Sequence, residues 1–92
     1  MADETLCNLT AVELRKLLVD AHVSAREVLD AHLSRIDRVN PLVNALVTIV
    51  PEIAAERALE ADEKLMRGEP LGLLHGLPVA HKDLFDTAGI RT

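Results

Sequence analysis

Lys82 is the side chain in this sequence best placed to do chemistry, because it lies among apolar neighbours in the segment from Pro78 to Leu84. If residues 78–84 form a strand, period-2 alternation puts Ala80 and Lys82 on one face and Asp83 on the other. Lys82 then either sits at the strand end with its ammonium in water, or is buried so that its pKa falls and its neutral amine acts as a general base. Most lysines are solvated, which favours the first reading, and the spacing alone leaves both open.

The histidines and the cysteine do not have the spacing of a metal site. His75 and His81 are six residues apart and His22 and His32 are ten apart, whereas a helical zinc site uses histidines at i and i+4. Cys7 is the single cysteine, so it can form neither an internal disulfide nor a cysteine-based metal cage. A reducing cytoplasm fits it best. We therefore expect no metal and no cofactor.

Two helices are predicted in the first half of the chain. Thr10 followed by Glu13, and Ser24 followed by Glu27, are capping-box pairs, in which a hydroxyl and a carboxylate satisfy N–H groups left open at a helix start. Apolar residues recur at helical spacing after each pair. Each pair should therefore begin an amphipathic helix.

The ends of these helices are marked by turn and proline signals. The first helix should end near His22, and the second should run over residues 25–39. Asn40 and Pro41 should stop the second helix, because proline has no N–H and disfavours helical geometry in the residue before it. The short connection makes the two helices an antiparallel or steeply crossed pair.

A β-α-β unit is predicted after the two helices. Residues 44–50 are rich in β-branched side chains and bounded by prolines, which is typical of a buried strand. Pro51 suits the first turn of a helix over residues 52–67, and Gly68 is placed to cap it. A glycine-containing loop leads to a second strand over residues 78–84, with a right-handed crossover. The predicted fold class is α/β.

Length and composition allow one small domain and exclude several functions. The chain has 92 residues, of which 49% are hydrophobic, enough for one core. The net charge of −5 disfavours nucleic-acid binding. No stretch has the length of a membrane span or the pattern of a signal peptide. The domain, residues 1–92, divides into a flexible start (1–8), a helical pair (9–39) and the β-α-β segment (44–92).

The last quarter of the sequence resembles a known family. Residues 74–86 read Leu-His-Gly-Leu-Pro-Val-Ala-His-Lys-Asp-Leu-Phe-Asp. This string is similar to the first characteristic block of the amidase-signature family, in which Leu-His-Gly and a proline precede Lys-Asp. Residues 9–14 and 39–45 are similar to upstream parts of the same family. The resemblance covers residues 9–92.

The resemblance implies a serine hydrolase that cleaves small-molecule carboxamides without a cofactor, on a mixed-sheet α/β fold with a Ser, cis-Ser, Lys triad. Lys82 matches the family's lysine, which takes a proton from the cis-serine, which in turn deprotonates the nucleophilic serine. Ser24 and Ser34 are the only serines present. One is placed as a helix cap and the other lies within a helix, so neither is assigned as the nucleophile.

The family's two serines belong to later segments of much longer chains. We therefore expect this chain to be an amino-terminal fragment, or one part of a split enzyme, that supplies Lys82 and is inactive alone. Its expected partners are the amide substrate and the complementary remainder of the enzyme, or a second copy paired through exposed strand edges. The alternative hypothesis is a non-catalytic binding or scaffold module that docks onto a partner.

Overall fold

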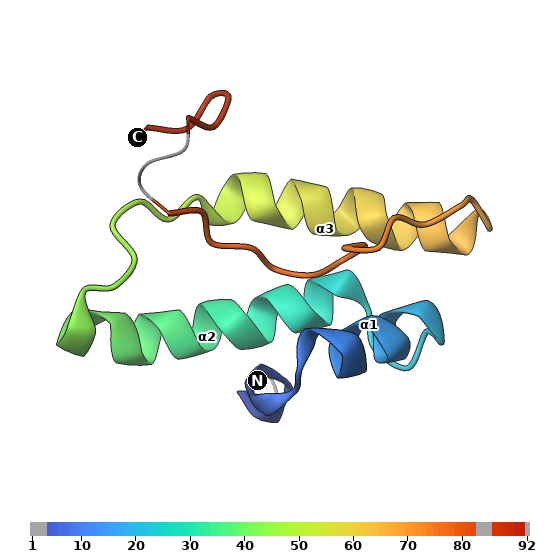
Figure 1. The fold of residues 1–92 in the computed structure, drawn as a ribbon, viewed down its shortest axis with the longest axis horizontal. Helices are drawn as coiled ribbons and strands as arrows, with labels where there is room; N and C mark the ends of the chain where they lie inside the picture. The colour runs from blue at the N-terminus through green and yellow to red at the C-terminus, as the bar shows by residue number, and fades with distance from the viewer. Residues whose placement is uncertain (1–3, 83–85, 92) are drawn as a thin grey trace.

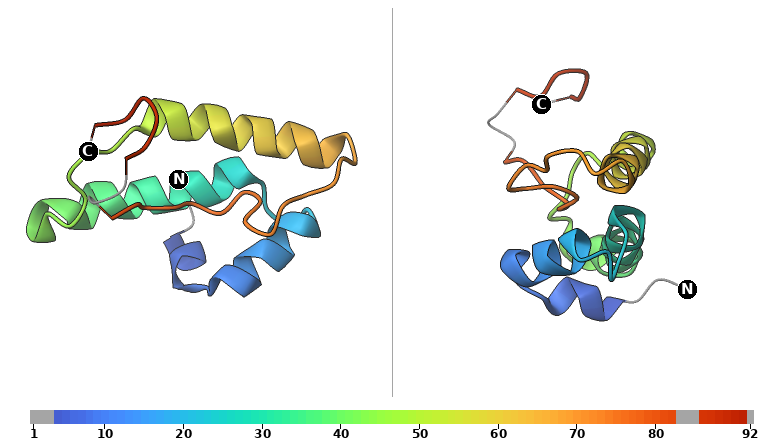
Figure 2. Two further views of the ribbon diagram at one scale, coloured as in Figure 1. Left: turned by 45° about the horizontal axis from the view of Figure 1, so that its top comes forward. Right: turned by 90° about the vertical axis from the view of Figure 1, so that its right-hand side faces the viewer.

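The computed structural model describes residues 4–82 and 86–91. In chain order it contains a short 3-10 helix, η1 (Glu4–Asn8), and three α-helices, α1 (Ala11–Val19), α2 (Ala25–Val43) and α3 (Pro51–Met66). α2 and α3 lie side by side and run in opposite directions (Figure 1), and η1 also packs on α2. The chain after α3 returns along one side of this helix pair (Figure 2). No helix in these residue ranges is long and apolar enough to cross a membrane.

α1 begins with the predicted capping box. The Glu13 N–H donates to Thr10 Oγ1 at 3.1 Å, and the Thr10 N–H donates to Glu13 Oε1 at 2.9 Å. The hydrogen bond from the Thr10 backbone lowers the pKa of the Glu13 carboxyl, and that of the Thr10 hydroxyl adds to it. α1 ends at Val19, three residues before the predicted end at His22. The earlier end follows from Ala21, whose left-handed conformation, with φ of 59°, cannot continue a helix.

All the N–H groups in the first turn of α2 have partners, and one of these partners belongs to α3. Ser24 and Glu27 form the second predicted capping box, with N–H to oxygen distances of 3.0 and 3.1 Å. The Ala25 and Arg26 N–H groups donate to the two carboxylate oxygens of Asp62, at 2.7 and 3.2 Å. The positive end of the helix dipole also favours a carboxylate there. Asp62 therefore fastens α3 to the start of α2.

α2 is four residues longer than predicted, because it continues through Pro41 to Val43. The expectation that Asn40 and Pro41 stop it is wrong: so close to the helix end, the missing proline N–H removes one hydrogen bond and the turn still forms. The Asn40 side chain fixes the chain beyond by donating to the Leu46 carbonyl and accepting from the Leu46 N–H, both at 3.0 Å. Asn44, with φ of 51°, ends the helix.

α3 begins and ends within one residue of the prediction. Pro51 lies in the first turn, where its missing N–H would have no helical partner. After the helix, Gly68 takes the left-handed conformation, with φ of 71°. The N–H groups of Gly68 and Glu69 donate to the carbonyls of Leu65 and Lys64 at 3.0 and 3.3 Å. This is the Schellman arrangement, and it confirms Gly68 as the cap.

The core is small and aliphatic, as the composition predicts. Leu18 of α1 and Val28 of α2 are almost completely buried, while α3 contributes one small residue, Ala58. Full burial of a leucine or valine side chain contributes roughly 1.5–3 kcal/mol, so α1 and α2 supply most of the apolar stabilisation. The buried hydrophobic residues are Leu6, Leu14, Leu18, Ala25, Val28, Leu29, Ala31 and Ala58.

Glu4 ties η1 to the second half of α2. Its carboxylate accepts hydrogen bonds from Arg38 Nη2 at 2.6 Å, Ser34 Oγ at 3.2 Å and Arg35 Nε at 3.4 Å. The bond from Arg38 is the largest reason that the pKa of the Glu4 carboxyl is lowered, and the bonds from Arg35 and Ser34 add to it. Part of the segment expected to be flexible, residues 4–8, is thus held against α2.

The two predicted strands are not formed by the described residues, so these residues do not show the expected sheet. Residues 44–50 and 78–82 have irregular backbone, and residues 83–84 of the second predicted strand lie outside the described residues. The β-bridge found in the described part of the chain is an isolated one between Thr87 and Ile90. A strand exists only through hydrogen bonds to a neighbouring strand. Within the described ranges neither segment has such a neighbour.

A turn at Gly76 lays the returning chain on α1 and α2. Gly76 has φ of 72°, and a Cβ there would lie 3.1 Å from Leu18 Cδ1 and 3.4 Å from Ala25 Cβ. Leu77, the next residue, packs against the core. Glycine is therefore required at this position both by the backbone conformation and by the close approach of two core side chains.

Ala21→Gly should raise the free energy of unfolding by about 0.5–1 kcal/mol. Alanine in the left-handed conformation costs about 1–2 kcal/mol, and glycine removes this strain. Glycine also gives the unfolded chain more freedom, which offsets about 0.4–1 kcal/mol of the stabilisation. Urea unfolding of the 92-residue chain measures the change. The control Ala11→Gly, at the other end of α1, should lower stability. A destabilised Ala21→Gly variant would contradict the turn described here.

Glu4 should make the stability of the fold depend on acid pH. Because the pKa of the Glu4 carboxyl is lower in the folded chain than its ordinary value of 4.5, its contribution is complete above that pH and is lost as pH falls through the folded pKa. Glu4→Gln should therefore reduce stability at pH 7, and the difference from the parent chain should shrink below about pH 4. Thermal unfolding between pH 7 and pH 3 measures this difference. Glu60→Gln, on the exposed face of α3, is the control, and an equal effect of both substitutions would refute the Glu4 anchor.

Gly76→Ala should destabilise the chain by about 1–3 kcal/mol, because it adds left-handed strain to a contact with Leu18 that is too close. Two other glycines separate the causes. Gly68→Ala keeps the strain, but its Cβ would meet nothing within 4 Å, and Gly72→Ala has neither a left-handed φ nor a contact. Unfolding midpoints should fall in the order Gly72→Ala, Gly68→Ala, Gly76→Ala, with the last the least stable. Equal stability of the Gly76 and Gly72 variants would exclude the close packing.

Candidate active site

Lys82 lies at the end of the chain that returns over the helices, five residues after the last core contact at Leu77. Its side chain is exposed, and it makes no hydrogen bond or ion pair with the described residues. A lysine acts as a general base only when its amine is uncharged, which requires burial or a neighbouring cation. The described residues alone leave this side chain open to water.

The two serines are both occupied by structural hydrogen bonds. Ser24 Oγ accepts the Glu27 N–H at the start of α2, which confirms its predicted role as a cap. Ser34 Oγ donates to Glu4 Oε2 at 3.2 Å. Within residues 4–82 and 86–91, no serine hydroxyl is therefore presented to Lys82 as a nucleophile.

The described histidines differ in their surroundings. His32 Nδ1 is 2.8 Å from the carbonyl oxygen of Val28, one turn earlier in α2. His75 is half-buried in the turn over residues 72–76, and His81 is exposed next to Lys82. Among the residues that the structure describes, no three His, Cys, Asp or Glu side chains are grouped as metal ligands.

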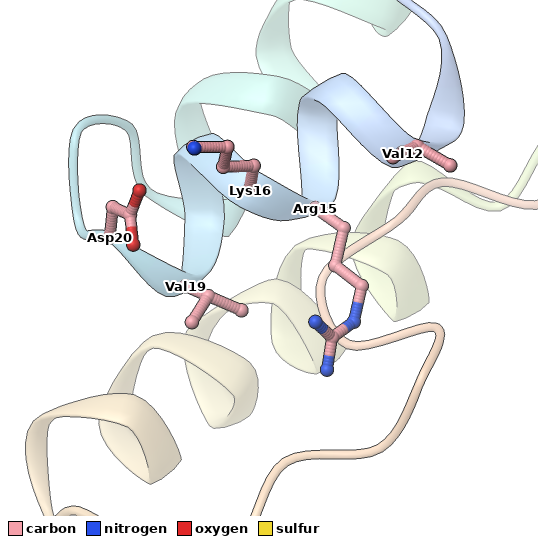
Figure 3. Close-up of a pocket in the computed structure, with 5 residues that line it drawn as sticks. All are labelled: Val12, Arg15, Lys16, Val19 and Asp20. Carbon is pink, nitrogen blue, oxygen red and sulfur yellow. The ribbon is translucent and has the colours of Figure 1, made fainter.

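An arginine of α1 holds the loop that leads to Lys82. Arg15 Nε donates to the Leu73 carbonyl at 2.9 Å, and Arg15 Nη2 donates to the Gly72 carbonyl at 3.3 Å. Figure 3 shows the Arg15 guanidinium extending from α1 toward the loop, away from Lys16 and Asp20. The surface hollow in this view is lined by Val12, Arg15, Lys16, Val19 and Asp20. The hollow lies on α1 and does not include Lys82.

A second, more apolar groove of about 280 Å³ lies where the returning chain meets α2 and α3. Pro78 and Val79 form one wall, and small side chains such as Ala54 and Ala61 of α3 form another. Arg57 supplies the charged group at this groove. Val79, which lines this groove, lies three residues before Lys82.

Two residues that shape this region, Arg15 and Asp62, are not identified by the sequence patterns. Arg15 has the position of an ordinary solvent-facing residue of an amphipathic helix, so its contact with the loop has no local signal. Asp62 does carry one: it lies four residues after the buried Ala58, hence near the apolar face of α3. A carboxylate at such a position needs a partner, and the open N–H groups of another helix start are one.

Comparison with known proteins gives consistent matches over nearly the whole chain. The chain is 46% identical over 83 residues to a glutamyl-tRNA(Gln) amidotransferase A subunit of Methylococcus capsulatus, covering 90% of this chain and 17% of that protein. It is 48% identical over 87 residues to the protein of the same name in Thermoanaerobacter pseudethanolicus, covering 95% and 18%. The corresponding figures for Caldanaerobacter subterraneus are 49%, 87 residues, 95% and 18%. No solved structure matches the chain.

These relatives are much longer than the chain, which spans less than a fifth of the length of each. The model of the amidase family matches residues 27–92. That range contains α3, most of α2, the loop held by Arg15, and Lys82. The match covers well over half of the sequence, and the chain therefore belongs to the amidase family.

Proposed function

We propose that the intact protein containing this chain is an amide-cleaving enzyme in which Lys82 is the general base. The observation that carries the proposal is the position of Lys82 inside the range that matches the amidase family, in the string Leu-His-Gly-Leu-Pro-Val-Ala-His-Lys-Asp. Lys82 is exposed among the described residues, so a group from elsewhere in the protein can reach its amine.

The proposed reaction is acyl transfer through a serine. The uncharged Lys82 amine takes the proton of a serine with a cis peptide bond, and that serine takes the proton of the nucleophilic serine. The nucleophilic oxygen attacks the amide carbon, the carbon–nitrogen bond breaks, and the proton returns from Lys82 to the leaving nitrogen. Water, or another acceptor, then releases the acyl group. Since Ser24 and Ser34 are held in structural bonds, both catalytic serines come from other parts of the intact protein.

Burial of Lys82 is the part of the mechanism that the intact protein must add. The two irregular segments are apolar and open to contact: Val47 is 84% exposed in residues 44–50, and Val79 is 62% exposed in residues 78–82. We propose that both segments pair with strands from the remainder of the protein, which forms the α/β sheet and covers the lysine. Pairing would also bury these side chains, at a gain of roughly 25 cal/mol per Å² of apolar surface.

The names of the relatives support a more specific proposal about the reaction. The three relatives from Methylococcus, Thermoanaerobacter and Caldanaerobacter all carry the name of a glutamyl-tRNA(Gln) amidotransferase A subunit. An amidotransferase passes the amide nitrogen to an acceptor, and its A subunit works beside other subunits. We propose the same for the intact protein, with a small carboxamide as the nitrogen donor and partner subunits that receive the ammonia. A cytoplasmic location, expected from the single Cys7, stays a prediction.

A non-catalytic role as a docking module is the second candidate. The observation in its favour is the set of large apolar side chains that the helices leave exposed, such as Leu42, Leu59 and Met66, which are 82%, 58% and 88% exposed. Burial of these side chains against another protein would contribute apolar free energy to such a contact. The same exposed side chains could also contact the remainder of an enzyme. The activity of a Lys82 variant therefore separates the two candidate functions.

Lys82→Ala in the intact protein should lower kcat for carboxamide cleavage by about 10⁴- to 10⁶-fold, the scale seen when a member of a hydrolytic triad is removed. The release of ammonia from a carboxamide measures it. The neighbouring exposed His81→Ala is the matched control and should keep kcat within about threefold, because His81 has no role in the proton relay. Circular dichroism should show the same fold for both. Near-normal turnover by folded Lys82→Ala would exclude Lys82 as the base and leave only a docking role for this part of the protein.

A further inference from the structure

We propose that Arg15 of α1 is a positioning residue for Lys82: it clamps the loop at residues 72–73 and thereby sets where the lysine is presented. The inference rests on the proposed function, because it deepens the role of Lys82 as the base. It also makes a claim about the chain alone, namely that one arginine side chain orders the loop. The two claims can be tested separately.

The clamp is a fork that holds two successive carbonyl groups. Arg15 Nε bonds the Leu73 carbonyl at 2.9 Å and Arg15 Nη2 bonds the Gly72 carbonyl at 3.3 Å. The planar guanidinium can satisfy both at once with little loss of freedom per bond, whereas a lysine ammonium is a point donor. Hydrogen bonds from a charged donor are also stronger than those between neutral groups. The identity of residue 15 as arginine is thus part of the geometry.

The clamped carbonyls belong to a tight turn that continues the constraint toward Lys82. The Gly72 carbonyl also accepts the His75 N–H at 3.2 Å, and the Leu77 N–H donates to the Leu74 carbonyl at 3.1 Å. Arg15 therefore bonds the atom on which the first bond of the turn depends. Loss of the clamp should loosen the turn as a whole.

The turn brings the chain into contact with α1 and α2 at Gly76. Gly76 lies so close to Leu18 and Ala25 that a Cβ would stand 3.1–3.4 Å from their side chains. Leu77 packs against the core and Val79 lines the groove along α3. These contacts are short-range, so they form only when the turn before them has its correct shape.

The length of the free arm shows what the clamp contributes. With Leu77 seated, five residues lead to Lys82, and an extended chain of that length reaches about 17 Å. If the loop detaches back to the end of α3 at Met66, the arm has sixteen residues. Because the effective concentration at the end of a flexible tether falls as about the −3/2 power of its length, the lysine would meet its partner up to about sixfold less often.

The first experiment measures amide hydrogen exchange by NMR in the 92-residue chain. Arg15→Ala should raise the exchange rates of the His75 and Leu77 amides about tenfold, the low end for loss of hydrogen bonds to a charged donor. Arg15→Lys should fall between the parent and Arg15→Ala. Lys16→Ala, which removes a neighbouring charge from the same helix, should change them by less than about twofold. Rates in Arg15→Ala within twofold of the parent chain would overturn the clamp.

The second experiment measures amide cleavage by the intact protein with the same three variants. Arg15→Ala should lower kcat about three- to sixfold with KM unchanged, since Arg15 touches no substrate. It should also move the acidic limb of the kcat–pH profile to higher pH, because an amine that is exposed to water more often keeps its proton up to a higher pH. Arg15→Lys should recover part of kcat and Lys16→Ala should resemble the parent.

The two experiments separate failure of the proposal from failure of the proposed function. An Arg15→Ala enzyme with faster exchange but with parental kcat and pH profile would show a structural clamp and refute the positioning role. If Lys82→Ala is itself active, the lysine is not the base and the proposed function fails, whatever the exchange data show. Parental exchange rates in Arg15→Ala would refute the clamp even in an enzyme that depends on Lys82.

Discussion

The arrangement of this chain depends on one carboxylate at the start of one helix. Asp62 accepts the N–H groups of Ala25 and Arg26, which would otherwise be unpaired in the first turn of α2. This contact matters more than its number of bonds suggests, because α3 meets the core through small side chains, the buried Ala58 and the half-buried Ala54, Ala55 and Ala61. Apolar packing alone would hold α3 weakly, so the carboxylate sets its position on α2.

The position of α3 in turn determines where the returning chain can lie. The chain lies along one side of the helix pair, and the groove beside it is lined by small side chains, with Ala54 and Ala61 on α3 and Ala25 at the start of α2. Gly76 makes the closest approach, and Arg15 holds the preceding loop from the other side. Helical packing, a glycine turn and an arginine clamp thus act in series, and together they determine where Lys82 lies at the surface.

Local signals were sufficient to predict the helix starts, and long-range contacts explain what could not be predicted. Thr10 and Ser24 cap helices through residues three positions away, so the pattern is complete within one turn of sequence. The prediction that Pro41 stops α2 was wrong, because the free-energy cost of a proline in a helix depends on how near the helix end it lies. The predicted strands need partners that the described residues do not contain. The two hydrogen bonds of Arg15 join residues that are separated by 58 and 57 positions in the sequence. No local pattern predicts a contact over such a separation. Lys82 was identified through its family string, not through its surroundings.

The proposed mechanism requires that the same lysine is open to water in the helical part of the protein and uncharged once the rest of the protein covers it. NMR of lysine side chains enriched in carbon-13 at the ε position measures its charge directly, because the signal shifts when the amine loses its proton. The Lys82 signal is assigned by its disappearance in Lys82→Arg. In the intact protein, we predict an uncharged Lys82 at the pH of amide cleavage while Lys16 and Lys64 remain charged. A Lys82 amine that stays charged at that pH, as the amines of the other two lysines do, would contradict this mechanism.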